Sequence, residues 1–367
     1  MTSSRLSIAS AFAVLAVSSV CLAAETSKPY TIINTAQYMG TGGIDYVYAD
    51  NDARRLYVPR GNSILVFDLD TLKSAGEIPE TGGRGVAVDP KSNHGFSSSR
   101  PVTMFDTKTL AVIKKIEVQG GPDGILFEPL SQRVFIFSHS QPNATVIDPK
   151  DGTIVGTIDL GGAPEQAASD GKGHLYVDIE DKDKVAVVDV QSLKVTAQYE
   201  LGGQGGTPAG LGLDAKNGIL FVMCRNPANC VVMSAADGKI LATLPIGKGS
   251  DGGGFNPNTL EAFSSQGDGT LTIIHENSPN SFEVTQTVTT KSRAKTSTLD
   301  TKNNRIVLIT TEPAPNAPGA ANAPVAAAGA PGPGREGGPA GGPPDGQRRG
   351  GGGRGGPGFL DILAVGR

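Results

Sequence analysis

The chain has 367 residues, of which 50 are glycine, about twice the usual share of roughly 7%. Its formal net charge is −4, which excludes a strongly basic nucleic-acid-binding protein. The glycines follow no three-residue period, which excludes collagen. Hydrophobic residues make up 38% of the chain and fall in short runs typical of β-strands. The sequence therefore predicts a folded all-β protein rather than a wholly disordered one.

The first 24 residues are typical of a secretory signal peptide. Arg5 precedes an apolar run from Leu6 to Val17, and small residues follow near Ala23, in the order that signal peptides show. An apolar run of about a dozen residues is too short for an ordinary membrane span. We therefore expect a mature protein of residues 25–367 that is periplasmic or extracellular and has no membrane span. Lipidation of Cys21 is an alternative that the sequence leaves open.

Residues 312–358 differ from the rest of the chain in composition. They contain 16 glycines and 10 prolines in 47 residues. Such a segment buries too little apolar surface to offset its ordering entropy, so we predict a disordered insertion. Its Arg-Arg-Gly-Gly-Gly-Gly-Arg run resembles an RGG-type nucleic-acid segment, but a formal charge of only +1 favours a flexible linker. We expect no nucleic-acid partner.

A repeat of about 40 residues runs through the rest of the chain. Each unit has an apolar stretch that begins near glycine and ends at a turn, followed by three more strand-like runs. The units begin near Thr41, Thr81, Gln119, Gly161, Gly202, Gly247 and Lys291, 38 to 45 residues apart. This period with four short strands per unit is typical of propeller blades. Seven units predict one domain, a seven-bladed β-propeller.

The seventh unit is incomplete and explains both ends of the domain. Its first two strands are expected at 296–300 and 305–310, and its third at 359–365, beyond the insertion. The strand-like segment 30–38 has no blade of its own. We predict that this N-terminal strand completes blade seven and closes the ring, because an open ring would leave unpaired strand edges.

Two units resemble those of the YVTN-repeat (YncE-like) β-propeller family. The resembling segments are Leu56-Tyr-Val-Pro with Ile64-Leu-Val-Phe-Asp, and Leu175-Tyr-Val-Asp with Val187-Val-Asp. The resemblance covers about residues 30–311 and 359–367, although the literal Tyr-Val-Thr-Asn tetrapeptide does not occur. It implies a secreted bacterial or archaeal propeller, and most such propellers have no assigned activity.

Charged residues are predicted to ring one mouth of the central channel. The units align on the residue that ends each inner strand, and the residue five positions earlier should lie at the mouth. These mouth positions are Asp45, Arg84, Asp123, Glu165, Ala209, Asp251 and Lys295. Close charges shift one another's pKa values and often mark sites, so the six ionisable residues are our predicted ligand-binding residues. Ordinary charged residues in exposed loops are the alternative.

The mixed charges of this ring suit a polar small molecule or a hard cation such as calcium. No metal ligands are assigned, because no HxH or HExxH spacing occurs. His139 is the one histidine expected on the same face as the ring. Asp68, Asp106, Asp148 and Asp189 end third strands before turns, and we expect them to be structural.

Cys224 and Cys230 flank a short turn between two predicted strands of blade five. An oxidising, exported compartment favours a disulfide between them. Free thiols and a metal-binding pair are the alternatives.

Three functions stay open. The lack of a catalytic motif, such as the GxSxG elbow, favours a monomeric, non-catalytic scaffold that binds a protein, a peptide or a small polar ligand. The alternative is a lactonase-like hydrolase that uses the mouth carboxylates, with or without a divalent cation, and in which Arg84 polarises a carbonyl. A quinoprotein-like or amine-dehydrogenase-like redox propeller ranks last, because the chain has no tryptophan.

Overall fold

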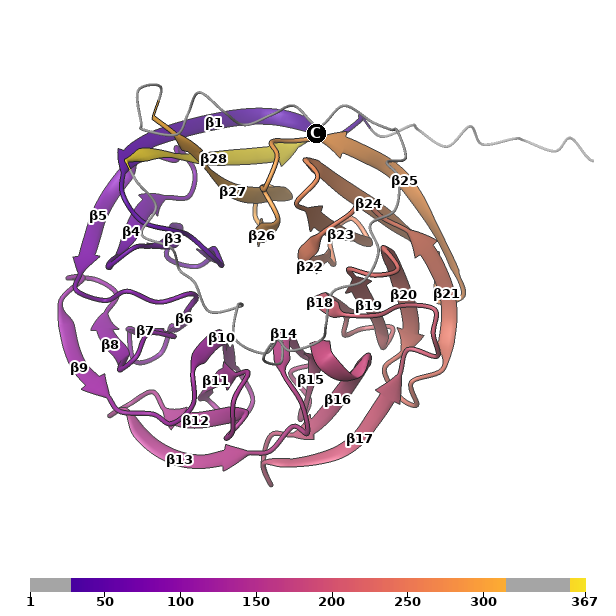
Figure 1. Ribbon diagram of the computed structural model, residues 1–367, viewed down its shortest axis with the longest axis horizontal. Helices are drawn as coiled ribbons and strands as arrows, with labels where there is room; N and C mark the ends of the chain where they lie inside the picture. Colours follow the sequence, from indigo (N-terminus) through magenta and orange to yellow (C-terminus); the bar gives the residue numbers. More distant parts are fainter. Residues whose placement is uncertain (1–27, 315–356) are drawn as a thin grey trace, which may run out of the picture.

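A computed structural model describes residues 28–314 and 357–367; the predicted signal peptide and most of the predicted insertion lie outside these ranges. The described residues form seven four-stranded antiparallel sheets. Figure 1 shows the sheets set radially around one central axis, in chain order. The predicted seven-bladed β-propeller is therefore confirmed.

Each of the first six blades uses four consecutive strands, from the axis outward. Blades one to three contain β2 (Tyr48–Asp50), β3 (Arg55–Arg60), β4 (Ser63–Asp68) and β5 (Ser74–Pro79); β6 (Val86–Asp89), β7 (His94–Ser97), β8 (Val102–Asp106) and β9 (Val112–Ile116); and β10 (Pro122–Glu128), β11 (Arg133–Ser138), β12 (Ala144–Asp148) and β13 (Thr153–Ile158). Blades four to six contain β14 (Pro164–Ser169), β15 (His174–Ile179), β16 (Lys184–Asp189) and β17 (Lys194–Glu200); β18 (Pro208–Asp214), β19 (Ile219–Cys224), β20 (Asn229–Ser234) and β21 (Ile240–Pro245); and β22 (Ser250–Asn256), β23 (Glu261–Gln266), β24 (Thr270–Ser278) and β25 (Ser281–Thr289). A single 3₁₀ turn in the described residues, η1 (Glu180–Lys182), joins β15 to β16.

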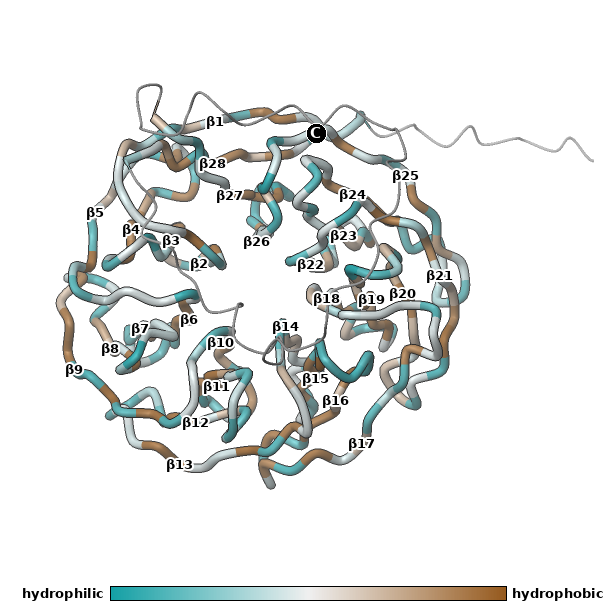
Figure 2. The backbone as a smooth tube through the Cα atoms, viewed as in Figure 1, coloured by the Kyte–Doolittle hydropathy of each residue, from teal (hydrophilic) through white to brown (hydrophobic). Residues whose placement is uncertain are grey.

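The hydrophobic core is divided among the interfaces between neighbouring blades. Both faces of a blade are covered, so its second and third strands are apolar in continuous runs rather than alternating. In β3, Leu56 and Val58 pack toward blade seven, whereas Tyr57 between them packs toward blade two. Brown, hydrophobic stretches accordingly run through the blades around the whole ring in Figure 2.

Aspartates at strand ends stabilise the turns. Asp68 accepts hydrogen bonds from the backbone N–H and the hydroxyl of Thr71, and Asp106 does the same for Thr109. The carboxylate of Asp89 likewise accepts backbone N–H groups two and three residues later. These contacts fit the structural role expected for aspartates before turns.

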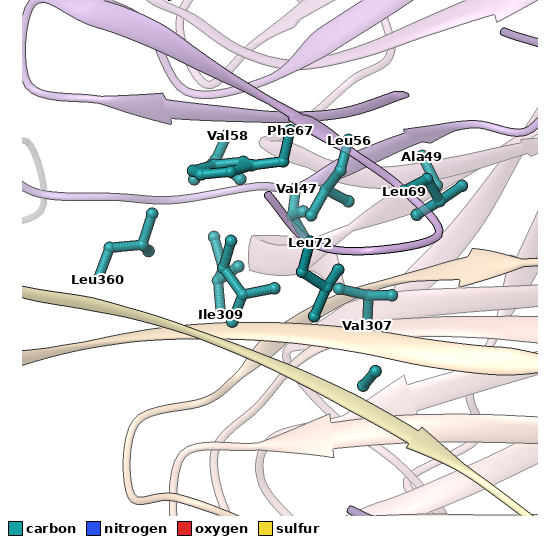
Figure 3. Close-up of a cluster of buried hydrophobic side chains, with 12 residues drawn as sticks. Val47, Ala49, Leu56, Val58, Phe67, Leu69, Leu72, Val307, Ile309 and Leu360 are labelled. Atoms are coloured by element: carbon teal, nitrogen blue, oxygen red, sulfur yellow. The ribbon is translucent and has the colours of Figure 1, made fainter. Parts of the chain in front are cut away.

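Blade seven joins the two ends of the domain, as predicted. Its strands run in the order β26 (Thr296–Asp300), β27 (Arg305–Pro313), β28 (Gly358–Gly366) and β1 (Thr31–Gly40), and β1 pairs with β28 from Thr31↔Gly366 to Gly40↔Gly358. The strands extend into the predicted insertion at both of its ends, because Pro313 pairs with Gly358. Figure 3 shows side chains of this blade, including Val307, Ile309 and Leu360, against those of blade one.

Part of the glycine excess lies where two inner strands come very close together. A Cβ on Gly210 would lie 2.7 Å from the carbonyl carbon of Gly252, and one on Gly212 would lie 2.7 Å from the carbonyl oxygen of Gly254. Real Cβ atoms do not approach backbone atoms that closely, so β18 and β22 can pack in this way only without side chains.

Candidate functional site

The six predicted mouth residues lie at the start of the inner strands. Asp123, Glu165 and Asp251 are the second residues of β10, β14 and β22. The pairing of each of these strands with its neighbour shifts register at that residue. Such β-bulges turn a side chain away from the regular alternation of the strand. The remaining members, Asp45, Arg84 and Lys295, come just before β2, β6 and β26.

Arg84 and His139 connect the first half of the ring. Arg84 Nη1 lies 2.9 Å from Asp45 Oδ2, and Arg84 Nε lies 3.3 Å from Asp123 Oδ1. His139 Nε2 lies 3.1 Å from Asp123 Oδ2 and 3.7 Å from Glu165 Oε1. A continuous row of polar contacts therefore runs across blades one to four.

Arg225 connects the second half. Its guanidinium lies 3.4 Å from Glu165 Oε1 and 2.8 Å from Glu180 Oε2, and it also pairs with Asp251. Asp251 pairs in turn with the ammonium group of Lys295. We call these nine charged residues the mouth network: Asp45, Arg84, Asp123, His139, Glu165, Glu180, Arg225, Asp251 and Lys295.

The inner-strand alignment did not identify Arg225 and Glu180. A second alignment could have found them, because His139, Glu180 and Arg225 each follow the last residue of the second strand in blades three, four and five. Loops after second strands open on the same face as the inner-strand starts. Arg225 also supplies the charge that Ala209, the neutral mouth position of blade five, does not.

The network has a buried acidic layer and an exposed basic rim. The side chains of Asp123, Glu165 and Asp251 are 8%, 9% and 10% exposed. Those of Arg84, His139 and Lys295 are 37%, 39% and 46% exposed. A molecule that approaches this face therefore meets nitrogen donors before it meets carboxylates.

Burial shifts the pKa values of the acidic layer upward. Burial, together with the hydrogen bond to Glu180, raises the pKa of Glu165 to about 10, against the lowering effect of Arg225. Burial also raises the pKa of Asp123 and of Asp45. Burial alone would raise the pKa of Glu180 too, but the contacts with Glu165 and Arg225 lower it. The pKa values of these two neighbouring acids are therefore shifted in opposite directions, upward for Glu165 and downward for Glu180.

Polar side chains cross the channel just below the network. The hydroxyl of Tyr46, in blade one, donates a hydrogen bond of 3.1 Å to Glu165 Oε2 in blade four. Gln166 donates to the carbonyl of Gly253, and its side-chain oxygen accepts from the N–H groups of Leu211 and Gly253. Tyr46 and Gln166 also line a cavity of about 330 Å³, together with inner-strand residues that include Tyr48, Leu213 and Phe255.

Three network residues form a possible metal-ligand set. Asp123, His139 and Glu165 each offer one ligand atom, and these three atoms all lie within 4.8 Å of one another. Calcium takes six to eight oxygen ligands, so a set of two carboxylates and an imidazole does not suit the calcium that the sequence suggested. Zinc and other divalent first-row transition ions are commonly bound by imidazole nitrogen together with carboxylate oxygen.

The predicted Cys224–Cys230 disulfide is wrong in this structure, which has both residues as buried free thiols. β20 begins at Asn229, so Cys230 lies opposite Met223 rather than opposite Cys224. The side chain of Cys224 packs in the interface between blades four and five, whereas that of Cys230 packs in the interface between blades five and six. Two thiols on opposite faces of one sheet cannot be joined without moving the backbone.

Comparison with known proteins supports the fold and gives no family. No protein-family model matches the chain, and no curated protein matches it. Among solved structures, U3-55K matches with a TM-score of 0.64 at 10% identity, over 76% of this chain and 92% of that one. The WD40 repeats of RRP9 match with a TM-score of 0.64 at 10% identity, over 77% and 91% of the two chains. A chain of the mitotic checkpoint complex matches with a TM-score of 0.66 at 12% identity, over 82% and 95%.

These structures share the β-propeller fold with this chain, and identities this low carry no function across. In the part of the chain that the structure describes, no helix is long and apolar enough to cross a membrane.

Proposed function

We propose that this protein is an exported, YVTN-type propeller that binds carboxylate-bearing molecules, a peptide or a small polar ligand, at the face carrying the mouth network. The observation that carries the proposal is the basic rim over a buried acidic layer. Arg84 and Lys295 are the most exposed permanent charges of the network, and both are positive. Export rests on the signal-peptide pattern of the first 24 residues.

Anchored cations suit the recognition of a carboxylate. Arg84 is held between Asp45 and Asp123, and Lys295 is held by Asp251. Ligand binding would therefore immobilise few additional side-chain torsions, and this lowers the entropic cost of association. The buried carboxylates keep the rim charges in place and leave the outward N–H donors for a ligand.

Matched ligands test the proposal directly. Aliphatic dicarboxylates and short peptides should raise the melting temperature of the purified protein, whereas the corresponding amides should not. Lys295→Ala should abolish the shift, because it removes a rim charge while Arg225 still pairs with Asp251. Lys91→Ala is the control: Lys91 is an exposed lysine at the β6–β7 turn, outside the network. Equal shifts with carboxylates and amides, or a full shift in Lys295→Ala, would refute the proposal.

A further inference from the structure

The contact geometry of Asp123, His139 and Glu165 matches that of a metal site. His139 Nε2 lies 3.1 Å from an oxygen of Asp123 and 3.7 Å from an oxygen of Glu165. Ligands bound about 2.1 Å from a tetrahedral zinc ion lie about 3.4 Å from one another. The two separations from His139 bracket that value, and the three ligand atoms all lie within 4.8 Å of one another. Small side-chain movements would therefore bring them to the spacing of ligands around one ion.

The backbone holds the two carboxylates firmly. Asp123 and Glu165 both lie at β-bulges of inner strands, in β10 and β14. His139 follows β11 of the same blade as Asp123, and its side chain reaches back over the mouth. A site built on adjacent strands of a closed ring keeps its ligands in place better than one built on a free loop.

The two oxygens of buried Asp123 face different neighbours. Asp123 is 5% exposed, and its Oδ1 lies 3.3 Å from Arg84 Nε in an ion pair without a hydrogen bond. Its Oδ2 lies 3.1 Å from His139 Nε2. Buried carboxylate oxygens in folded proteins are nearly always hydrogen-bonded or bound to an ion. An ion beside His139 would contact Oδ2 and leave Oδ1 to Arg84.

The formal charge of the mouth network is negative, which favours the binding of a divalent cation. Five carboxylates (Asp45, Asp123, Glu165, Glu180 and Asp251) face three permanent cations (Arg84, Arg225 and Lys295). The formal excess is two negative charges when His139 is neutral. One divalent cation bound among these carboxylates would balance that excess.

The surrounding contacts can persist when an ion is bound. Arg225 keeps its pairs with Glu180 and Asp251 if Glu165 Oε1 turns toward a metal. Arg84 keeps its 2.9 Å contact with Asp45. Tyr46 holds the other oxygen of Glu165, Oε2, at 3.1 Å, as outer-shell partners commonly hold ligating carboxylates.

We propose that Asp123, His139 and Glu165 bind one divalent first-row transition ion, of the zinc class, at the channel mouth. Three protein ligands leave a fourth position of a tetrahedral ion open. This inference goes beyond the proposed function, because the ion would bind in the absence of any carboxylate ligand.

Metal titration of the chain tests the proposal. Untagged protein stripped with a chelator is titrated with ZnCl₂ by calorimetry and with CoCl₂ by visible absorption. We expect one ion per chain and d–d bands typical of low-coordinate cobalt with nitrogen and oxygen ligands. His139→Ala should weaken zinc binding by about 100-fold or more. Loss of an outer-shell partner typically lowers metal affinity by about 10- to 100-fold, and loss of a direct ligand should lower it at least as much.

The controls separate this site from other histidines and from misfolding. His174→Ala removes a histidine that is also paired with an aspartate, Asp170, but in an exposed turn; it should leave the affinity unchanged. Asp123→Asn should weaken zinc binding with little change of shape, which keeps the test valid if His139→Ala folds poorly. Binding of no transition ion, preference for Ca²⁺ over Zn²⁺, or unchanged affinity in His139→Ala would overturn the proposal. A carboxylate-binding failure with intact zinc binding would refute only the proposed function.

Discussion

Asp178 is a fully buried acid in the interface between blades four and five. Neither of its carboxylate oxygens has a hydrogen-bond partner among the described residues. Burial raises the pKa of Asp178 well above its ordinary value, and the charge of Arg225 offsets only part of this rise. The carboxyl group of the folded protein therefore keeps its proton to a higher pH than that of the unfolded chain.

This difference makes stability depend on pH in a defined direction. The folded state binds a proton that the unfolded state releases above about pH 4, so the contribution of Asp178 to stability falls as pH rises toward its folded pKa. Asp178→Asn cannot ionise. We expect wild type to be less stable relative to Asp178→Asn at pH 8 than at pH 5, with a slope of at most about 1.4 kcal/mol per pH unit.

Urea unfolding of both proteins at the two pH values measures this difference. Asp45, Asp123 and Glu165 also have raised pKa values, but they are present in both proteins and cancel in the comparison. A stability difference that stays constant with pH would show that Asp178 is ionised in the folded state.

The inner strands β18 and β22 show why glycine is concentrated around the axis. Gly212 faces the backbone of Gly254, where an added Cβ would lie 2.7 Å from the carbonyl oxygen. Gly121, by contrast, lies in the link before β10, has no positive φ, and its Cβ would meet no atom closer than 4.0 Å.

Alanine at these two glycines should therefore have different effects. Gly212→Ala forces the two inner strands apart, and we expect it to destabilise the fold by about 1–3 kcal/mol, as overpacking does. Gly121→Ala should change stability by less than about 0.5 kcal/mol. Chemical denaturation of the two variants checks this, and equal effects would show that the close approach of β18 and β22 does not constrain the fold.

Strand alternation also decides which parts of the site could be predicted from the sequence. The repeat aligns the inner strands correctly, so the alignment alone groups Asp45, Arg84 and the other four charged mouth positions. Arg225 and Glu180 were missed because the alignment followed only the inner strands, whereas these two residues come directly after the second strands β19 and β15. The Cys224–Cys230 disulfide failed because a shift of one residue in the start of β20 moves a side chain to the other face.

Contacts between distant blades could not be predicted from the repeat pattern either. Tyr46 reaches from blade one to Glu165 in blade four, and nothing in either unit alone indicates that pairing. Such contacts depend on the diameter of the ring and on which side chains point to the axis. They emerge only when all seven blades are in place.

Closure of the ring is a property of the whole molecule and depends on one strand, β28. β28 pairs with β27 on one side and with β1 on the other. Arg60 of blade one, itself buried, donates to the carbonyls of Tyr38 in β1 and Gly358 in β28. Loss of β28 would remove the middle of this arrangement and leave two strand edges unpaired.

Deletion of residues 359–367 should therefore lower the melting temperature sharply. A milder variant tests the packing alone: Leu360→Ala removes a fully buried side chain of the cluster in Figure 3, and we expect a loss of about 2–5 kcal/mol. Met39→Ala, on the same strand pair but 58% exposed, is the matched control and should have little effect. A melting curve unchanged by the deletion would contradict closure through β28.

The antiparallel pairing of Thr31 with Gly366 also places the beginning of β1, the first strand, beside the end of β28, the last strand. A linker of a few residues would convert β28 and β1 into an ordinary β-hairpin. The polypeptide could then begin and end elsewhere, for instance in the stretch between Ala314 and Pro357, which are joined by a backbone hydrogen bond. Circular permutation at that point would preserve every strand of the ring and move both termini to the adjoining ends of β27 and β28, the middle strands of blade seven.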